Sequence, residues 1–233
     1  MSKTVVIHQP DFLPHLAFFH RFLHADLYVV LDTAQYVDGS SRSWMNRDKI
    51  KTPRGEQWLT VSVRKAPRGT PIRDIELSSD TDWRAGNLNL LRENYRRASC
   101  FGEIFPRLEA LYRQPCRTLL EFNLRSIEML LELFSIRIPM VLTHDLQPAG
   151  ARNDLLVDIL RKVGATRYLS GPGARAYLEA APFEAAGIQV IWQEFRHPVY
   201  PQLHGEFLPF LSSIDLLLNC GAAQGAKILR SSP

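Results

Sequence analysis

The sequence predicts an α/β protein whose doubly wound, mostly parallel sheet carries a helical insertion. Three observations predict this class. The start of the chain alternates strand, helix and strand, and such a βαβ unit requires a parallel sheet with a right-handed crossover. The alternation returns after residue 137, so we expect five buried parallel strands with helices between them. The length of 233 residues fits one large domain with a sizeable insertion.

The N-terminal βαβ unit spans residues 4–31. A short β-branched run at 4–8 predicts a buried strand, and apolar residues at helical spacing predict a helix over 12–25. A second apolar run predicts a strand at 27–31, which Asp32 ends. We expect these elements to belong to a single α/β domain covering residues 1–233.

The middle of the chain is predicted to interrupt this pattern with two insertions. Residues 33–80 are polar and irregular, and we expect them to form a polar loop and a hairpin. The alternating run at 58–63 is the expected first strand of that hairpin, and 72–77 its partner. Residues 81–137 carry three helical stretches, which we expect to form a helical insertion or cap over the sheet.

The C-terminal part resumes the α/β pattern. Strands are expected at 138–143, 167–170 and 188–192, and helices at 153–163, 174–181 and 208–220. The turn before the helix at 174–181 is formed by residues 171–173, which contain two glycines and a proline.

Composition excludes several classes of protein. Apolar residues make up 45% and charged residues 22%, as in soluble globular proteins, which excludes disordered and fibrous chains. No apolar run approaches the roughly 18 residues that span a bilayer, and the N-terminus lacks a signal-peptide pattern. Cys100, Cys116 and Cys220 are odd in number and form no CxxC pair, so we expect reduced thiols in a cytoplasmic protein and neither a disulfide framework nor a zinc cluster.

The charge balance favours a small anionic ligand. Lys and Arg total 28 against 24 Asp and Glu, for a net charge of +4, and arginine greatly outnumbers lysine. The planar arginine fork suits phosphates and carboxylates, so we expect a small-molecule anionic or nucleotide-like substrate, although a solvated basic surface explains the same excess. No dense basic stripe is present, which argues against an extended nucleic-acid interface. The sequence does not indicate an oligomeric state.

The candidate site lies beyond the carboxyl ends of the strands, where open α/β sheets bind their ligands. Polar residues follow each predicted strand, and their coincidence predicts one shared site. These residues are His8 and Gln9, Asp32, Gln35 and Tyr36, His144 and Asp145, Ser170, Gly171 and Gly173, and Arg196 and His197.

His8 is the main catalytic candidate. It closes the first buried strand just before a helix, where it could contact an anion or act as a general acid/base at neutral pH. The alternative is a packed histidine bonded to the backbone. We expect Gln9 and Asp32 to orient the substrate beside it, although Asp32 could also bind a ribose hydroxyl or magnesium, or cap a turn.

Further candidates are expected to bind the substrate. Asn46 and Arg47 fall in a polar stretch where the arginine could hold phosphate or simply lie on the surface. The segment from Ser170 to Gly173 could offer backbone N–H groups to an anion or form a simple turn, and it lacks the Walker A and GxGxxG patterns. The proline-rich stretch at 197–202 is a rigid carrier for three further candidates, namely His197, Tyr200 and Gln202.

Other chemistries have little support. His15, His20 and His24 follow helical spacing, but no carboxylate or cysteine completes a ligand set and neighbouring phenylalanines indicate packing, so we expect no metal site. No Gly-x-Ser-x-Gly turn or Cys–His nucleophile pattern is present, so covalent acyl-enzyme chemistry is not indicated.

Six stretches together resemble the WbqC-like family, and they occur in the same order along nearly the whole chain. The stretches are 6–14 (VIHQPDFLP), 31–36 (LDTAQY), Asn46-Arg47, 168–171 (YLSG), 197–202 (HPVYPQ) and 211–219 (LSSIDLLLN). The resemblance implies a bacterial protein connected with surface polysaccharide or unusual-sugar biosynthesis. The chain departs from the family pattern at His15, where the family usually has tryptophan, and at Ala17, where it usually has glycine.

A second resemblance concerns architecture. The polar strand end, the histidine-rich helix and the following strand look like those of pantothenate synthetases and nucleotidylyltransferases. Those enzymes carry a His-x-Gly-His pair that stabilises charge on a triphosphate, and this sequence has no such pair. The resemblance therefore implies a nucleotidylyltransferase-like sheet without that motif.

These observations favour an enzyme of sugar-nucleotide, polysaccharide or natural-product biosynthesis. The expected reaction is group transfer, either of an acyl or aminoacyl group to an amino group or nucleotidyl activation of a small acid. His8 would be the acid/base, and ATP with magnesium or coenzyme A would be the cofactor. The alternative is a non-catalytic protein that binds a nucleotide-sugar or assembles with partner enzymes.

Overall fold

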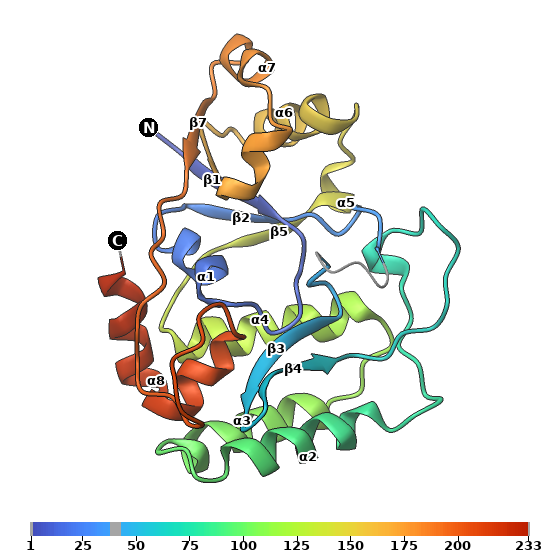
Figure 1. Ribbon diagram of the computed structural model, residues 1–233. Helices are drawn as coiled ribbons and strands as arrows, with labels where there is room; N and C mark the ends of the chain where they lie inside the picture. The colour runs from blue at the N-terminus through green and yellow to red at the C-terminus, as the bar shows by residue number, and fades with distance from the viewer. Residues whose placement is uncertain (1, 38–42, 233) are drawn as a thin grey trace.

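A five-stranded parallel sheet forms the centre of the computed structural model, which describes residues 2–37 and 43–232 (Figure 1). Its order is β5-β2-β1-β6-β7, and each neighbouring pair is parallel. The strands are β1 (Thr4–His8), β2 (Leu27–Val30), β5 (Met140–Leu142), β6 (Arg167–Ser170) and β7 (Gln189–Trp192). The doubly wound α/β fold expected from the sequence is confirmed. Residues 38–42 of the expected polar insertion lie outside the described residues.

Helices cover both faces of the sheet (Figure 1). On one face lie α1 (Leu16–Phe22), α4 (Leu119–Leu133) and α8 (Ser213–Ser231); on the other lie α6 (Arg152–Lys162) and α7 (Ala180–Ala185). A short helix, α5 (Thr143–Leu146), follows β5. Alternation along β1 divides the core, because Val6 packs on the α1 side while Val5 and Ile7 pack on the α6 side.

The strand order reverses between β1 and β6. The chain leaves β1 through α1 and returns to β2 on one side, whereas it leaves β6 through α7 and returns to β7 on the other. Two right-handed crossovers on opposite faces therefore diverge at this point. Their divergence opens a crevice at the carboxyl ends of β1 and β6, which is where doubly wound sheets bind ligands.

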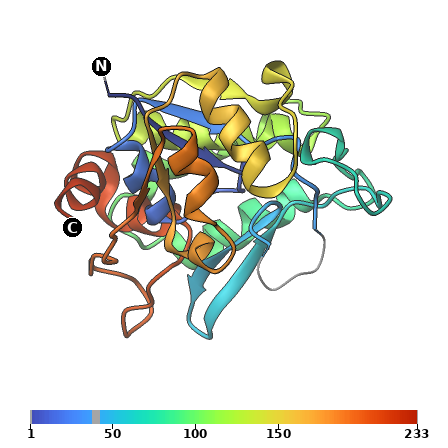
Figure 2. The same ribbon diagram turned by 90° about the horizontal axis from the view of Figure 1, so that it is seen from above.

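Three helices occupy the middle of the chain, as expected. They are α2 (Trp83–Tyr95), α3 (Phe101–Arg113) and α4, and they lie on the α1 side of the sheet. The start of α4 is a capping box, in which the Thr118 side chain accepts from the Glu121 N–H and the Glu121 carboxylate accepts from the Thr118 N–H. Seen from above, α6 and α7 lie in front of the sheet, and the three helices of the insertion lie behind it (Figure 2).

The hairpin expected between residues 58–63 and 72–77 is wrong in its partner strand. The structure pairs β3 (Arg47–Thr52) with β4 (Gly55–Thr60) in an antiparallel hairpin. Gly55 has a φ of 100° just after the turn, a conformation that glycine adopts without strain. The segment expected to pair instead holds a 3₁₀ turn, η1 (Ile72–Asp74), and meets the 58–63 run only at the single bridge from Val63 to Leu77.

Three helices differ from their expected bounds. The helix expected at 12–25 is shorter, because Leu13 has a φ of 40° and is followed by a proline, so α1 begins only at Leu16. The helix expected at 174–181 is replaced by a 3₁₀ turn, η2 (Pro172–Ala176), followed by α7. The last helix starts later than expected, where the Ser212 hydroxyl accepts from the Ile214 N–H, and it continues to the C-terminus across a kink at Gly221.

No helix among residues 2–37 and 43–232 is both long and apolar enough to cross a membrane.

Candidate functional site

A two-part cleft lies where the strand order reverses, at the carboxyl ends of β1 and β6. Its two cavities have volumes of about 700 Å³ and about 670 Å³, within the range of small-molecule sites. Ile7, His8, Tyr168 and Tyr177 line both, so the cavities adjoin. We call them the α6 half and the α1 half, after the helix that contributes to each.

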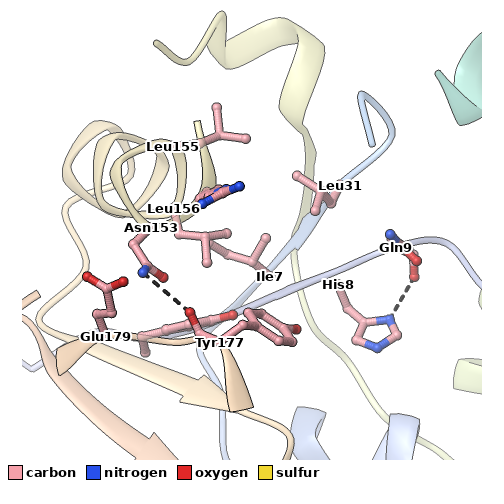
Figure 3. Close-up of a pocket in the computed structure, with 11 residues that line it drawn as sticks. Ile7, His8, Gln9, Leu31, Asn153, Leu155, Leu156, Tyr177 and Glu179 are labelled. Carbon is pink, nitrogen blue, oxygen red and sulfur yellow. Dashed lines mark hydrogen bonds between the residues drawn. The ribbon is translucent and has the colours of Figure 1, made fainter. Parts of the chain in front are cut away.

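The α6 half is mainly apolar. Figure 3 shows Ile7, Leu155 and Leu156 on one side and His8 with Gln9 on the other. Three polar residues at its edge are Arg152, Asn153 and Glu179. The Asn153 amide lies 3.5 Å from the carbonyl oxygen of Tyr177, and Tyr177 as a residue is 68% exposed.

The α1 half is basic. Its wall includes Arg21 and His15 from the helical side, Ser170 and Gly171 from the end of β6, and Arg175 from η2. None of its described lining residues is acidic. The two halves therefore differ in chemistry, and His8 stands at their junction.

Arg21 is a functional candidate that the sequence analysis missed. It is only 6% exposed, and its Nε has no hydrogen-bond partner. Its guanidinium carbon lies 5.6 Å from the centre of the Phe18 ring, and a Cβ added at Gly171 would lie 3.5 Å from its Nη1. Burial lowers the pKa of Arg21. The available sequence signal was a charged residue three positions after Phe18, on the apolar side of a buried helix.

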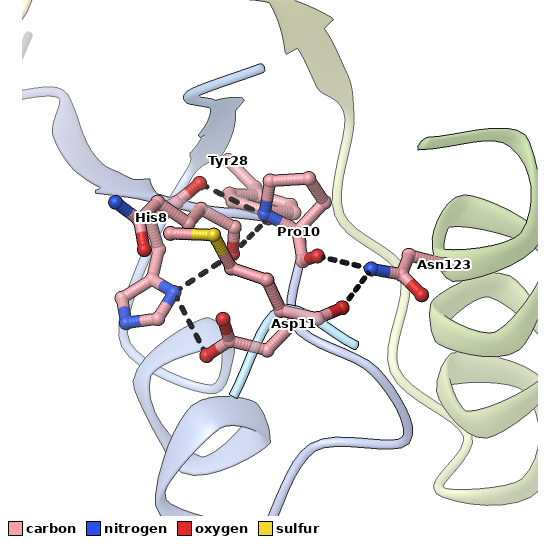
Figure 4. Close-up of polar contacts among 7 residues, drawn as sticks. His8, Pro10, Asp11, Tyr28 and Asn123 are labelled. Carbon is pink, nitrogen blue, oxygen red and sulfur yellow. Dashed lines mark hydrogen bonds and ion pairs between the residues drawn. The ribbon is translucent and has the colours of Figure 1, made fainter. Parts of the chain in front are cut away.

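The backbone determines the tautomer of His8, and burial determines its charge. Its Nδ1 lies 2.9 Å from the carbonyl oxygen of Gln9 and 3.6 Å from Oδ2 of Asp11 (Figure 4). A carbonyl oxygen only accepts, so Nδ1 carries the hydrogen and Nε2 keeps its lone pair. Burial and the nearby Arg21 guanidinium lower the pKa of His8 to about 3. His8 is therefore neutral at pH 7, and 30% of its side chain is exposed.

Asp11 is the second ionisable group beside His8, and it was also missed. It is buried, and burial raises its pKa to about 7, while Arg21 acts in the opposite direction. A carboxyl group with this pKa exchanges a proton near neutral pH. His8 and Asp11 thus form a pair in which the histidine is neutral and the carboxyl group titrates.

The loop that carries this pair is held from two sides (Figure 4). The Asn123 amide, buried in α4, donates to the carbonyl oxygens of Pro10 at 2.6 Å and Met45 at 2.7 Å. The Tyr28 hydroxyl donates to the carbonyl oxygens of His8 at 3.2 Å and Gln9 at 3.4 Å. These bonds satisfy buried carbonyl groups and hold the His8 backbone in one position.

Asp32 pairs with a histidine at the neighbouring strand end. Its buried carboxylate accepts from the backbone N–H of His144 at 3.1 Å and from Nδ1 of His144. Nε2 of His144 lies 3.3 Å from Oδ1 of Asp145. Asp32 follows Leu31, a lining residue of the α6 half, but it does not itself line the cleft.

Four other candidates lie outside the cleft lining. Gln35 is exposed and forms a bridge with Pro71, and the Tyr36 N–H donates to the Thr70 carbonyl. The loop expected at Asn46 and Arg47 is present only up to Asn46, because β3 begins at Arg47. Asn46 is buried and donates to the Val61 carbonyl at 3.2 Å, while Arg47 begins β3 with its guanidinium carbon 4.3 Å from the centre of a Trp58 ring.

The proline-rich loop takes its candidates away from the sheet ends. Gln202 donates to Oδ1 of buried Asp215 at 2.8 Å and accepts from Nζ of buried Lys51 at 3.1 Å. Tyr200 is buried beside the same carboxylate. His197 meets Phe210, which lines the α1 half, in an edge-to-face contact with ring centres 5.1 Å apart. Lys51 of β3 and Asp215 of α8 thus hold the loop, and these buried polar groups satisfy one another.

The structure thus brings His8, Gln9, Ser170, Gly171 and Gly173 together at the cleft. Within the described part of the chain, no three His, Cys, Asp or Glu side chains gather in a way that could hold a metal ion. The three histidines of the first helix separate. His15 lines the α1 half, where burial lowers its pKa to about 4, whereas the rings of His20 and His24 lie 4.9 Å apart outside it.

Comparison with known proteins places this cleft in a family. The model of the WbqC-like protein family matches residues 9–227. The chain is also 33% identical over 223 residues to the uncharacterized protein Rv1507c of Mycobacterium tuberculosis, covering 94% of this chain and 95% of that protein. No solved structure matches the chain. The match begins at Gln9, directly after β1, and includes the ends of the later strands, most of the cleft lining and the helical middle, so the chain belongs to the WbqC-like protein family.

Proposed function

We propose that this protein is a group-transfer enzyme that binds an anionic, nucleotide-like substrate in the two-part cleft, in sugar-nucleotide, polysaccharide or natural-product biosynthesis. One observation carries the proposal. A neutral histidine, His8, stands between a basic cavity and an apolar cavity, with Nδ1 held by the Gln9 carbonyl. That arrangement leaves Nε2 as a proton acceptor.

Proton transfer to His8 would accompany attack by the acceptor. As the amine or carboxylate of the acceptor forms its bond to the transferred group, Nε2 takes the proton that an amine must lose, and the bond to the donor breaks with its electron pair leaving on the donor. A bound anion offsets the Arg21 charge and so raises the pKa of His8 toward the range of an effective base. Substrate binding would therefore activate the histidine.

Two donors fit the cleft. An acyl or aminoacyl donor such as coenzyme A would place its apolar group in the α6 half and its phosphates in the α1 half. ATP with magnesium would instead support nucleotidyl activation of a small acid. Both place an anion in the basic half, so ligand identity must come from measurement.

A thermal-shift screen tests the ligand class first. The ligands are ATP with magnesium, nucleotide-sugars, coenzyme A and free amino acids. A ligand at about 100 times its Kd adds about 2.7 kcal/mol to the free energy of unfolding, and a chain of this size then gains roughly 5–10 °C in Tm. Donor and acceptor mixtures are next followed by mass spectrometry for the transferred group.

Two variants of His8 separate catalysis from structure. Asn places its amide near Nδ1 and keeps the bond to the Gln9 carbonyl, whereas Gln places its amide near Nε2. We expect His8→Asn and His8→Gln each to lower turnover at least about 100-fold, because neither amide accepts a proton. Near-normal turnover in His8→Asn would remove His8 from the chemistry and assign it a structural role.

A second function is favoured by one observation. The pKa of about 3 leaves His8 a weak base in the free protein, as a non-catalytic nucleotide-sugar binding or assembly protein would permit. His8→Ala distinguishes the two functions. Lost turnover with retained affinity indicates the enzyme, and lost affinity in a protein without turnover indicates the binding protein.

A further inference from the structure

We propose that Arg21 binds a phosphate group of the substrate in the α1 half, and that the α6 half binds the nucleoside that carries it. This inference rests on the proposed function for the choice of the cleft as the substrate site. It adds the orientation of the ligand and a binding residue that lies outside the motifs at the strand ends.

The first argument is the unsatisfied charge of Arg21. Buried charged groups are normally paired or fully hydrogen-bonded. The Arg21 side chain forms neither an ion pair nor a hydrogen bond with any residue that the structure describes, and its Nε is fully buried. Asp11 is close enough to affect its pKa, but no carboxylate oxygen lies within 4.0 Å. A bound anion would supply the missing partner.

The second argument is the composition of the wall around Arg21. The described lining of the α1 half contains Arg175 and two histidines and no acidic residue. Ser170 adds a hydroxyl group, and Gly171 lies beside the guanidinium, where an added Cβ would be in ordinary contact with Nη1 at 3.5 Å. At Gly173 an added Cβ would meet no atom within 4 Å, so the cleft is open at that point. This combination suits a phosphate, which accepts several charge-assisted hydrogen bonds at once.

The third argument is the chemistry of the α6 half. Leu155 and Leu156 provide an apolar floor, and Tyr177, a residue that is 68% exposed, adds an aromatic ring. A nucleobase stacks on such a ring. The Asn153 amide and the Glu179 carboxylate at the edge offer the donors and acceptors that match a base edge. Because Tyr177 borders both halves, one ligand can contact both.

Binding measurements without turnover test the phosphate site. The probes are inorganic pyrophosphate, ADP, UDP, adenosine and uridine, titrated by calorimetry into the full chain. Wild type is expected to bind pyrophosphate and at least one diphosphate. We expect Arg21→Met to lower the affinity for pyrophosphate and for that nucleoside diphosphate by about 10- to 100-fold. The matched control Arg97→Met removes the same charge from an exposed arginine outside the cleft, and its affinities should equal those of wild type.

A stability readout distinguishes a binding residue from a structural one. Arg21→Met removes a buried charge without a partner, so its unfolding midpoint should equal or exceed that of wild type. Arg21→Lys keeps the positive charge but lacks the planar guanidinium group, and it should retain part of the pyrophosphate affinity. It serves as the test if Arg21→Met does not fold.

Tyr177→Ala tests the nucleoside site. The ring is exposed, so its removal should leave stability unchanged. We expect the affinity for the bound nucleoside diphosphate to fall about tenfold, with pyrophosphate unaffected.

Three outcomes would overturn the inference. If Arg21→Met binds pyrophosphate as tightly as wild type does, there is no phosphate site at Arg21; if Arg21→Met does not fold, the same result in Arg21→Lys has this meaning. If Tyr177→Ala loses equal affinity for pyrophosphate and for the nucleoside diphosphate, there is no nucleoside site at Tyr177. Absence of binding of every probe to wild type removes both. A protein that binds these probes as expected but shows no turnover would refute only the proposed group transfer.

Discussion

Mild acid should destabilise this protein through two histidines in the cleft, and Asp11 should oppose them. Burial lowers the pKa of His8 to about 3 and that of His15 to about 4, from 6.5. As the pH is lowered through 6.5, the unfolded chain takes up these protons while the folded protein does not, so the free energy of unfolding decreases as the pH decreases. Asp11 has the opposite sign, because burial raises its pKa from 3.8 to about 7 and the folded protein takes up that proton first.

The magnitude follows from these pKa values. Between pH 6.5 and 5.0, each histidine lowers the free energy of unfolding by roughly 1–2 kcal/mol, and Asp11 raises it by a similar amount. Asp11 therefore offsets one of the two histidines, and the net loss from the three groups is roughly 1–2 kcal/mol. Burial also lowers the pKa of His20 and of His197. The loss of stability from these two histidines is the same in wild type and in both variants compared below, so it cancels in the comparison.

Urea unfolding at pH 6.5 and 5.0, followed by tryptophan fluorescence, measures this loss. His8→Asn removes one destabilising group, so its loss of stability between the two pH values should be smaller than that of wild type by roughly 1–2 kcal/mol. Asp11→Asn removes the opposing group, so its loss of stability should be larger than that of wild type by roughly 1–2 kcal/mol. The reasoning is refuted if wild type and both variants lose the same stability, since the cleft groups would then not carry the pH dependence.

Two further predictions concern residues outside the cleft. Gln202→Leu leaves buried Asp215 with one hydrogen-bond donor fewer. The free energy of unfolding in urea should therefore fall by about 1–3 kcal/mol, and the pyrophosphate affinity should stay unchanged. Weaker pyrophosphate binding without a loss of stability would instead indicate that Gln202 contacts the ligand. Gly221→Ala should cost at least about 1 kcal/mol, because φ is 76° and the new Cβ would lie 2.7 Å from Oε2 of Glu103. Its control, Gly173→Ala, meets no atom within 4 Å and should stay within about 0.5 kcal/mol of wild type in the same unfolding experiment.

The parts of the fold that could be predicted are those governed by local pattern. The β-branched run in β1 has no solvent-facing side, so it reads as a buried strand wherever it folds. The apolar periodicity of α4 likewise specifies its buried face. Strand pairing is not local, and β4 took β3 as its partner because a two-residue connection closes that hairpin at little entropic cost.

The candidate site was predicted only in part, for a similar reason. His8 and Ser170 follow strands, and the ends of adjacent parallel strands necessarily meet at one edge of the sheet. Tyr200 and Gln202 follow the last strand by several residues, and their loop turned toward Lys51 and Asp215, where its polar groups find partners. Distance along the chain from a strand end therefore limited the prediction.

The sequence by itself determined the fold class, the parallel sheet, the edge of the sheet that carries the candidate site and the family. Hydrophobic periodicity and the handedness of crossovers are sufficient for the fold and the sheet edge, since both act through the chain's own geometry, whereas the family follows from the resemblance of six sequence stretches. Only the tertiary structure decided that Arg21 is buried without a partner and that His8 is neutral. Charge and protonation depend on burial and on groups distant in sequence, and those are settled only when the chain packs.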